Sequence, residues 1–95
     1  MEWQATAVDT STDSTTVNDD PTLVKGVFVN TTLSNHAVVI KDGSTAKYTI
    51  PAQATAGTRY EFGPTMFATS LVVDPDDSST GNITVEWVNL EPDKR

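Results

Sequence analysis

The residues best suited to chemistry in this sequence are three carboxylates that lie close together, Asp74, Asp76 and Asp77. They could bind calcium, because calcium takes about six to eight oxygen ligands and often draws them from aspartates at alternating positions. Asp74 and Asp76 have that spacing, but the rest of the calcium-loop pattern is missing, since the glycine is displaced to position 81. The three aspartates are therefore weak calcium candidates, and a solvated turn is the simpler interpretation.

The other residue types that serve enzymes do not form a catalytic pattern. His36 is the only histidine, and nothing in the sequence places Asp42 or a serine where a catalytic triad would need them. A zinc site is excluded, because one histidine without cysteine leaves only carboxylates as further ligands. Glu61 and Glu86 are isolated carboxylates, and a chain of 95 residues leaves little room for the cleft of a glycosidase. We therefore expect no enzyme activity and no cofactor.

Composition and charge limit the partners. The 95 residues carry a formal net charge of −7, and residues 1–22 contain acidic side chains without a single base. An acidic chain repels phosphate backbones, which argues against nucleic-acid binding. No apolar run is long enough to span a membrane, so we expect no membrane partner. A domain this small without cysteine buries a modest core, and such domains often gain stability by forming oligomers.

Alternation of apolar and polar residues, with turn residues between the runs, predicts an all-β protein. The predicted strands cover residues 23–31, 37–41, 46–50, 58–62, 66–73 and 82–90. Asp42-Gly43 predicts a hairpin, Gly63-Pro64 predicts a turn, and the acidic segment that follows Val73 predicts a hairpin-like connection. We expect a small antiparallel β-sandwich or a jelly-roll-like barrel of six or seven strands.

The N-terminal residues differ in composition from the rest of the chain. Residues 9–20 are a low-complexity tract of aspartate, serine and threonine, which predicts a flexible acidic arm over residues 1–22. The sandwich would then occupy residues 23–90, and residues 91–95 would form a charged tail. Trp3 leaves two interpretations open. It could anchor a short edge strand, or the arm could reach a neighbouring subunit and place Trp3 in a pocket there.

Two of the predicted strands are apolar on both faces, which indicates burial on both sides or a subunit interface. We predict that these strands include both core residues and residues of a homo-oligomer interface, and that the interface residues fall among Trp3, Val27, Phe28, Val29, Val38, Val39 and Ile40. The remaining aromatic residues alternate with polar neighbours, so we assign them to the core rather than to a sugar-stacking platform. They are Tyr48, Tyr60, Phe62, Phe67 and Trp87.

Three stretches of sequence carry a resemblance to known proteins. They are KGVFVNTTLSNHAVVIKDG, YTIPA with the following AGTRYEFG, and FATSLVVDPDDSSTGNITVEW. Through them the chain from Val24 to Val88 resembles a group of short virion proteins of tailed bacteriophages. The resemblance implies a small β domain that serves as a capsid decoration (cement) protein and carries no active-site residues. It also implies a homo-oligomer, often a trimer, which assembles in the host cytoplasm and sits on the exterior of the capsid against the major capsid protein.

Two interpretations from other classes stay open. One is a carbohydrate- or receptor-binding β module of a phage fibre or spike, which would present a row of surface aromatics and often bind calcium. The other is an accessory domain of an enzyme, which would normally be fused to a catalytic domain. Met1 and the short charged C-terminal segment suggest a complete gene product, which weakens the accessory-domain interpretation.

Overall fold

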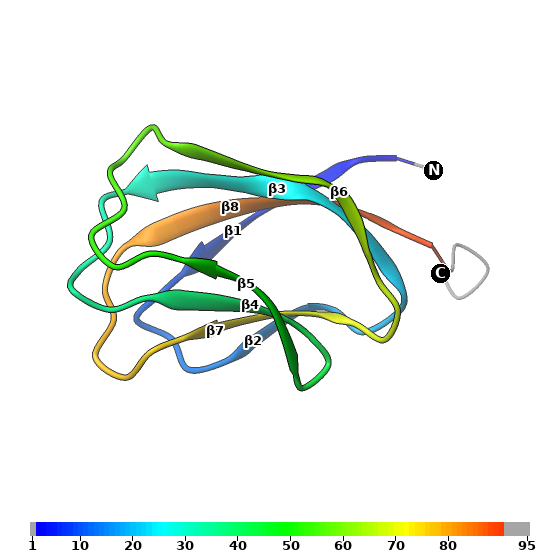
Figure 1. Cartoon of the computed structure of the whole chain (residues 1–95), viewed down its shortest axis with the longest axis horizontal. Coiled ribbons are helices and arrows are strands. Elements are labelled where there is room, and N and C mark those ends of the chain that lie inside the picture. Colours follow the sequence, from blue (N-terminus) through cyan, green and yellow to red (C-terminus); the bar gives the residue numbers. More distant parts are fainter. Residues whose placement is uncertain (1, 91–95) are drawn as a thin grey trace.

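Within residues 2–90, eight antiparallel strands form two four-stranded sheets that pack face to face (Figure 1). The computed structural model describes residues 2–90. The strands are β1 (Gln4–Asp9), β2 (Thr15–Asn18), β3 (Thr22–Thr31), β4 (Val38–Asp42), β5 (Thr45–Ile50), β6 (Arg59–Phe67), β7 (Leu71–Pro75) and β8 (Asn82–Asn89). Sheet A has the strand order β1-β8-β3-β6, and sheet B has the order β2-β7-β4-β5. None of the described residues lies in a helix long and apolar enough to cross a membrane.

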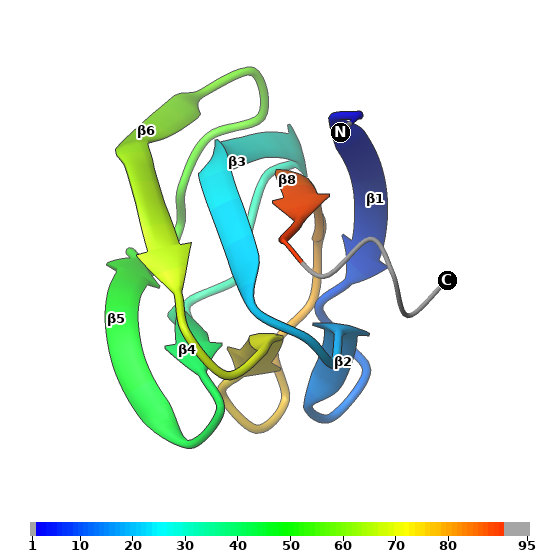
Figure 2. The ribbon, with the colours of Figure 1, turned by 90° about the vertical axis from the view of Figure 1, so that its right-hand side faces the viewer.

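The strands pair as if one long hairpin had been rolled up. β1 pairs with β8, β2 with β7, β3 with β6, and β4 with β5. Two further pairings, β3 with β8 and β4 with β7, complete the sheets. This strand order is that of a jelly roll, seen end-on in Figure 2. The all-β prediction is confirmed, and the described residues contain eight strands rather than six or seven.

The two additional strands come from the N-terminal residues, where the prediction of a flexible arm over residues 1–22 is wrong. β1 pairs with β8 in register along its whole length, and β2 pairs with β7. One valine anchors each strand, because Val8 is buried in the core and Val17 packs against it. The edge-strand interpretation therefore holds, but with Val8 as the anchor, since Trp3 is half exposed. The charged tail predicted over residues 91–95 lies outside the described residues.

Two connections also differ from the prediction. β7 lies in sheet B and β8 in sheet A, so the acidic segment between them crosses from one sheet to the other and does not close a hairpin. Gly63-Pro64 lies within β6 and is not a turn between strands. A proline is tolerated there because β6 is an edge strand, which needs ladder hydrogen bonds on one side only. The strand predicted over residues 66–73 is consequently divided between the end of β6 and β7.

The hairpin predicted at Asp42-Gly43 is confirmed. Asp42 at the end of β4 lies opposite Thr45 at the start of β5, which leaves Gly43 and Ser44 as the loop. Gly43 has a φ of 60°, the left-handed conformation that a type II′ turn requires at its first loop position. Glycine adopts this conformation without steric cost, so the local sequence fixes the register of this hairpin.

The hydrophobic core lies between the two sheets. Four of the seven predicted interface residues are fully buried in it: Val27, Val29, Val38 and Ile40. The interface prediction is therefore corrected for these four, because alternate residues of a strand point to opposite faces and these point inward. Phe28 of β3 and Val39 of β4 point outward from the same strands and are half-buried. Consecutive apolar residues of β3 and β4 thus lie alternately on the buried inner face and on the partly covered outer face of a sheet.

Candidate functional site

An apolar row crosses the outer face of sheet A near the chain termini. The strand register places Leu23 of β3 beside both Val88 of β8 and Met66 of β6. If the register between β1 and β8 is continued by one residue, Trp3 lies beside Val88. We call Trp3, Val88, Leu23 and Met66 the apolar row. Trp3 is 50% exposed and Met66 is 55% exposed, and they are the large hydrophobic side chains exposed among residues 2–90.

The two ends of the apolar row are exposed, while its centre is covered. Val88 is only 3% exposed although it is not part of the core cluster between the sheets. Its neighbour Leu23 is half-buried. The exposed apolar surface of the row therefore lies at its two ends, where the large side chains of Trp3 and Met66 are available to a partner.

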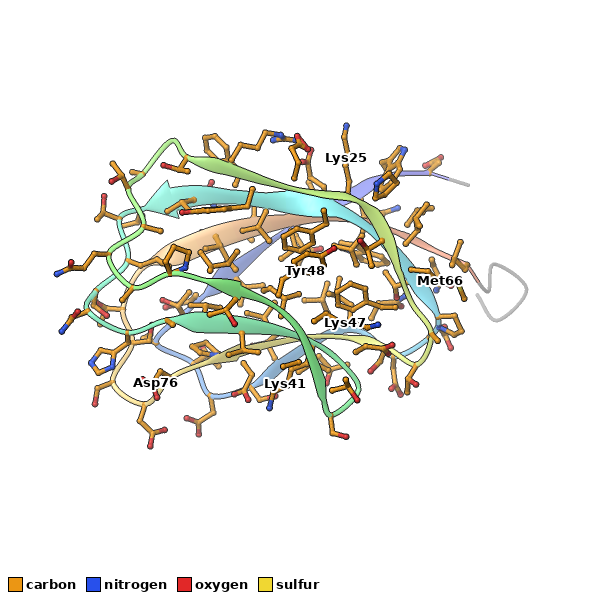
Figure 3. All side chains as sticks on the ribbon, viewed as in Figure 1. Lys25, Lys41, Lys47, Tyr48, Met66 and Asp76 are labelled. Atoms are coloured by element: carbon orange, nitrogen blue, oxygen red, sulfur yellow. The ribbon has the colours of Figure 1, made fainter. Side chains whose placement is uncertain are left out.

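A single cation stands beside the apolar row. The Nζ atom of Lys25 lies 5.8 Å from the centroid of the Trp3 ring, which is within the range of a cation–π contact. Lys25 falls at the irregularity in the register of β3, between Val24 and Gly26. Figure 3 shows its side chain extending away from the sandwich on the side of sheet A. The row therefore combines an exposed indole, a thioether and one positive charge.

An ionic group occupies the middle of the same face. The Arg59 guanidinium donates a 2.9 Å hydrogen bond to Glu61 and a second hydrogen bond to Glu86. The hydrogen bond to Glu61 is the main cause that raises the pKa of Arg59 above its usual value. One guanidinium therefore holds two carboxylates, Glu61 of its own strand β6 and Glu86 of β8.

The three aspartates predicted as weak calcium candidates do not converge. Asp74 pairs with Lys41 at 2.6 Å, so its charge is already compensated. Asp76 accepts a 3.0 Å hydrogen bond from the backbone N–H of Asp77, and its other oxygen lies 3.4 Å from Nδ1 of His36. Within residues 2–90, no group of three or more histidine, cysteine, aspartate or glutamate residues is placed to hold a metal ion. The structure therefore supplies no cage of oxygen ligands at this turn.

An open hollow of about 420 Å³ lies beside these aspartates. Its lining consists of Ala37, Val39, Asp74, Pro75, Asp76 and Asp77. The charged groups in this lining are either paired, as Asp74 is with Lys41, or exposed to water, as Asp76 and Asp77 are. Figure 3 shows Lys41 and Asp76 on the sheet B side of the molecule, away from Lys25 on the sheet A side. The hollow is thus a second and weaker candidate surface.

The aromatic residues assigned to the core are confirmed there. Phe62 and Phe67 are buried, and the partly buried rings packed against the core are Tyr48, Tyr60 and Trp87. Two of these rings also make specific contacts. Tyr48 stacks on Phe62 with 4.0 Å between ring centroids, and the Nε1–H of Trp87 donates a 3.0 Å hydrogen bond to the Thr6 hydroxyl. These rings hold the sheets together and do not form a surface platform.

The sequence pattern did not reveal the apolar row. Its members come from four segments that are far apart in the chain, and only the register between strands brings them to one line. The available signal was the occurrence of two large apolar residues, Trp3 and Met66, among polar neighbours near the ends of strands. Of the predicted interface residues, Trp3 belongs to the row and Phe28 lies on the same outer face.

Comparisons with known proteins add no relative. No family model matches the chain, and neither the curated proteins nor the solved structures contain a match to it.

Proposed function

We propose that this protein is a non-enzymatic structural component of a bacteriophage virion, a decoration (cement) protein that binds the capsid lattice as a homo-oligomer and stabilises the shell. The observation that carries the proposal is the apolar row with its exposed ends, Trp3 and Met66. Tryptophan and methionine are enriched in protein interfaces, and a tryptophan seated in a partner's pocket can dominate the binding energy. The partner is the major capsid protein on the exterior of the capsid.

The fold is compatible with this role. Jelly rolls occur in viral capsid proteins, and they also occur in lectins, so the fold by itself does not decide the function. In this chain apolar side chains fill the space between the sheets. What the fold offers to a partner is therefore its outer surface, and the outer face of sheet A carries the exposed indole and thioether.

The size of that face favours repeated contacts. Eight residues of β8 and four strands side by side give a flat projection of about 27 Å by about 19 Å, or about 500 Å². A specific interface of ordinary size uses about 800 Å² from each partner. One copy alone would therefore bind weakly, whereas several linked copies on a repeating lattice would bind much more tightly through multivalency.

Electron cryo-microscopy of the virion tests the proposal directly, together with co-sedimentation of the purified protein with capsids that lack it. We expect density matching the jelly roll on the capsid exterior. We also expect that Trp3→Ala with Met66→Ala reduces co-sedimentation by about tenfold or more, because two exposed anchors are lost. Val72→Ala, at a half-buried residue on the outer face of sheet B that does not line the hollow, is the control and should bind normally. Density at the tail, or none on the virion, would contradict the proposal.

The alternative is a carbohydrate- or receptor-binding module of a fibre or spike, which the exposed ring of Trp3 favours. In that case a glycan array should show binding that Trp3→Phe retains and Trp3→Ala loses, because sugars stack on any aromatic face. Loss of this binding on treatment with EDTA would add support for a lectin. A decoration protein should show no glycan binding in the same assay.

A further inference from the structure

The open edge of β1 differs from the other three sheet edges. β1 pairs with β8 over all six residues without an irregularity, and its sequence QATAVD contains no lysine, proline or glycine. β2 has four residues and a register shift, β5 exposes Lys47, and β6 contains Pro64 and a register shift. Short length, lysine, proline and bulges are the features that keep sheet edges from pairing with another chain. β1 is thus the edge that lacks such protection.

The orientation of the backbone groups along β1 follows from two hydrogen bonds. Thr10 donates its N–H to the carbonyl of Gly81, and Val29 of β3 donates to Thr58 on the β6 side. Since backbone groups alternate along a strand, the even-numbered residues of β1 face β8. Ala5 and Ala7 therefore direct their N–H and C=O groups toward the open edge. Their small side chains are exposed on the outer face of sheet A and leave the approach unobstructed.

We propose that β1 pairs with β1 of a second copy of this chain, antiparallel and about a two-fold axis at Thr6. In this register Ala5 of each copy lies opposite Ala7 of the other, and each pair exchanges two backbone hydrogen bonds. The two copies of sheet A then form one continuous sheet of eight strands. The arrangement is isologous and closes on itself, so it produces a dimer and not a filament.

Charge complementarity favours this register. Trp3 of one copy lies opposite Asp9 of the other, since their positions are equally distant from Thr6. Lys25 lies over the Trp3 ring and makes no ion pair with any of the described residues. The carboxylate of Asp9 from the second copy therefore meets Lys25, the cation on this face that has no ion pair among residues 2–90, whereas Arg59 is already held by Glu61 and Glu86. Two neighbouring registers are possible, one with Ala5 opposite Ala5 of the second copy and one with Ala7 opposite Ala7. In neither of them does Asp9 of one copy lie opposite Trp3 of the other.

This inference rests on the proposed function and extends it, because it specifies the homo-oligomer as a dimer that pairs through β1. The two-fold axis is perpendicular to the joined sheet, so both apolar rows lie on the same side and could contact the capsid together. The two-fold symmetry differs from the trimer that the resemblance implies. The test below uses the purified protein without capsids. A negative result there leaves capsid binding intact, and a failure to bind capsids leaves the dimer intact.

The first test is light scattering coupled to size exclusion, from micromolar to near-millimolar concentration. We expect a mass of twice 10.2 kDa at high concentration. Ala7→Pro removes an N–H that faces the open edge and no bond to β8, so two of the four hydrogen bonds that the Ala5–Ala7 pairs exchange are lost. The dimer dissociation constant should rise about tenfold or more. A monomer at all concentrations, or a trimer, would overturn the proposal.

Two double variants test the register between the two β1 strands. Neither of them introduces proline, so the test does not depend on whether β1 folds with a proline at position 7. Ala5→Lys with Ala7→Lys places like charges opposite each other and should abolish the dimer, even though the net charge falls from −7 to −5. Ala5→Lys with Ala7→Glu leaves the net charge at −7, and in the proposed register it places opposite charges together. This variant should therefore still form the dimer. If both double variants behave alike, the register is wrong.

Hydrogen exchange gives a third measurement on the unmodified protein. The amides of Thr6 and Val8 face β8 and should be protected at every concentration. The amides of Ala5 and Ala7 should exchange fast in dilute solution and become protected only as the concentration rises. Concentration-independent exchange at Ala5 and Ala7 would contradict the pairing of β1 with a second copy.

Discussion

The carboxylate of Asp42 accepts a 2.8 Å hydrogen bond from the backbone N–H of Thr69. The same carboxylate accepts hydrogen bonds from the backbone N–H groups of Ala68 at 2.9 Å and of Ser70 at 3.3 Å. One side chain in the hairpin between β4 and β5 thus holds the whole connection between β6 and β7. Since that connection carries the chain from sheet A to sheet B, Asp42 fixes the point where the two sheets are joined at this end.

We predict that Asp42 makes stability depend on pH. Burial, the largest single influence, raises the pKa of Asp42, but the N–H donors of Thr69, Ala68 and Ser70 and the charge of Lys47 together outweigh it and lower the pKa. The pKa in the folded state is then below the usual aspartate value of 3.8, so the stabilising contribution is present above about pH 3.8 and is lost as the pH falls through the lowered pKa.

The variant Asp42→Asn tests this contribution. It should lower the free energy of unfolding at pH 7 by about 1–2 kcal/mol, because the hydrogen bonds lose their charge. The difference from the parent protein should shrink near pH 3, as urea unfolding at both pH values can show. Asp77→Asn is the control, since the Asp77 side chain is exposed, and it should have little effect. An equal loss for Asp42→Asn at both pH values would contradict the assignment.

Tyr48 of β5 and Phe62 of β6 join the two sheets along the edge that these two strands form. Their rings are stacked with an interplanar angle of 6°, and the Tyr48 hydroxyl lies 2.7 Å from the Thr65 hydroxyl. Because β5 and β6 are the edge strands of different sheets, this contact closes the sandwich where no backbone pairing does. We predict that Tyr48→Phe costs about 1 kcal/mol through the lost hydrogen bond, and that Tyr48→Ala costs about 3 kcal/mol or more.

Tyr60→Phe is the matched control for Tyr48→Phe. Tyr60 also packs partly buried against the core, but its hydroxyl has no hydrogen bond among the described residues. Its loss should therefore change the free energy of unfolding by less than about 0.5 kcal/mol. Similar losses for both tyrosines in thermal or urea unfolding would show that the hydroxyl contact of Tyr48 contributes nothing specific.

A substitution at Thr6 tests whether β1 is a fixed strand of the folded domain. Its hydroxyl accepts the hydrogen bond from the Trp87 indole, and we predict that Thr6→Val lowers the free energy of unfolding by about 1–2 kcal/mol, because the half-buried Nε1–H is left without its acceptor. Thr16→Val, an exposed position in β2, controls for the change of residue type. If residues 1–22 behaved as a flexible arm, Thr6→Val would be neutral in the same urea titration.

Local signals in the sequence located the strands that follow residue 22, but they did not show which strands pair with each other. Asp42-Gly43 located a hairpin because a two-residue turn acts through its own residues. Val8 and Val17 gave no comparable signal, since a single valine in a polar tract becomes a core residue only when a neighbouring sheet offers pairing.

The apolar row shows the same limit for the candidate site. Leu23 and Val88 are 65 positions apart and become neighbours only through the register of β3 with β8. Composition could indicate a small acidic β domain with a surface for a partner. It could not indicate which surface, because a shift of one residue in any strand would move its side chains to the opposite face.

The register of β3 depends on a residue without a side chain. Gly26 lies opposite both Glu61 and Glu86, next to the irregularity that follows Val24. A Cβ atom at this position would lie 2.3 Å from the carbonyl oxygen of Tyr60, which belongs to the backbone of β6 and cannot move aside alone. We predict that Gly26→Ala costs about 1–3 kcal/mol by forcing β3 and β6 apart, as urea unfolding should show.

The variant Lys25→Ala, at the neighbouring position, is the control for Gly26→Ala. It shows whether any substitution at the irregularity in β3 destabilises the protein or only one that adds a Cβ atom at Gly26. Lys25 is exposed, and its replacement should leave the free energy of unfolding within about 0.5 kcal/mol of the parent protein. Since β3 carries Leu23 at the centre of the apolar row, Gly26→Ala should also disturb the row, whereas Lys25→Ala removes only its cation. A Gly26→Ala protein as stable as Lys25→Ala would mean that β3 and β6 are not held at the separation described.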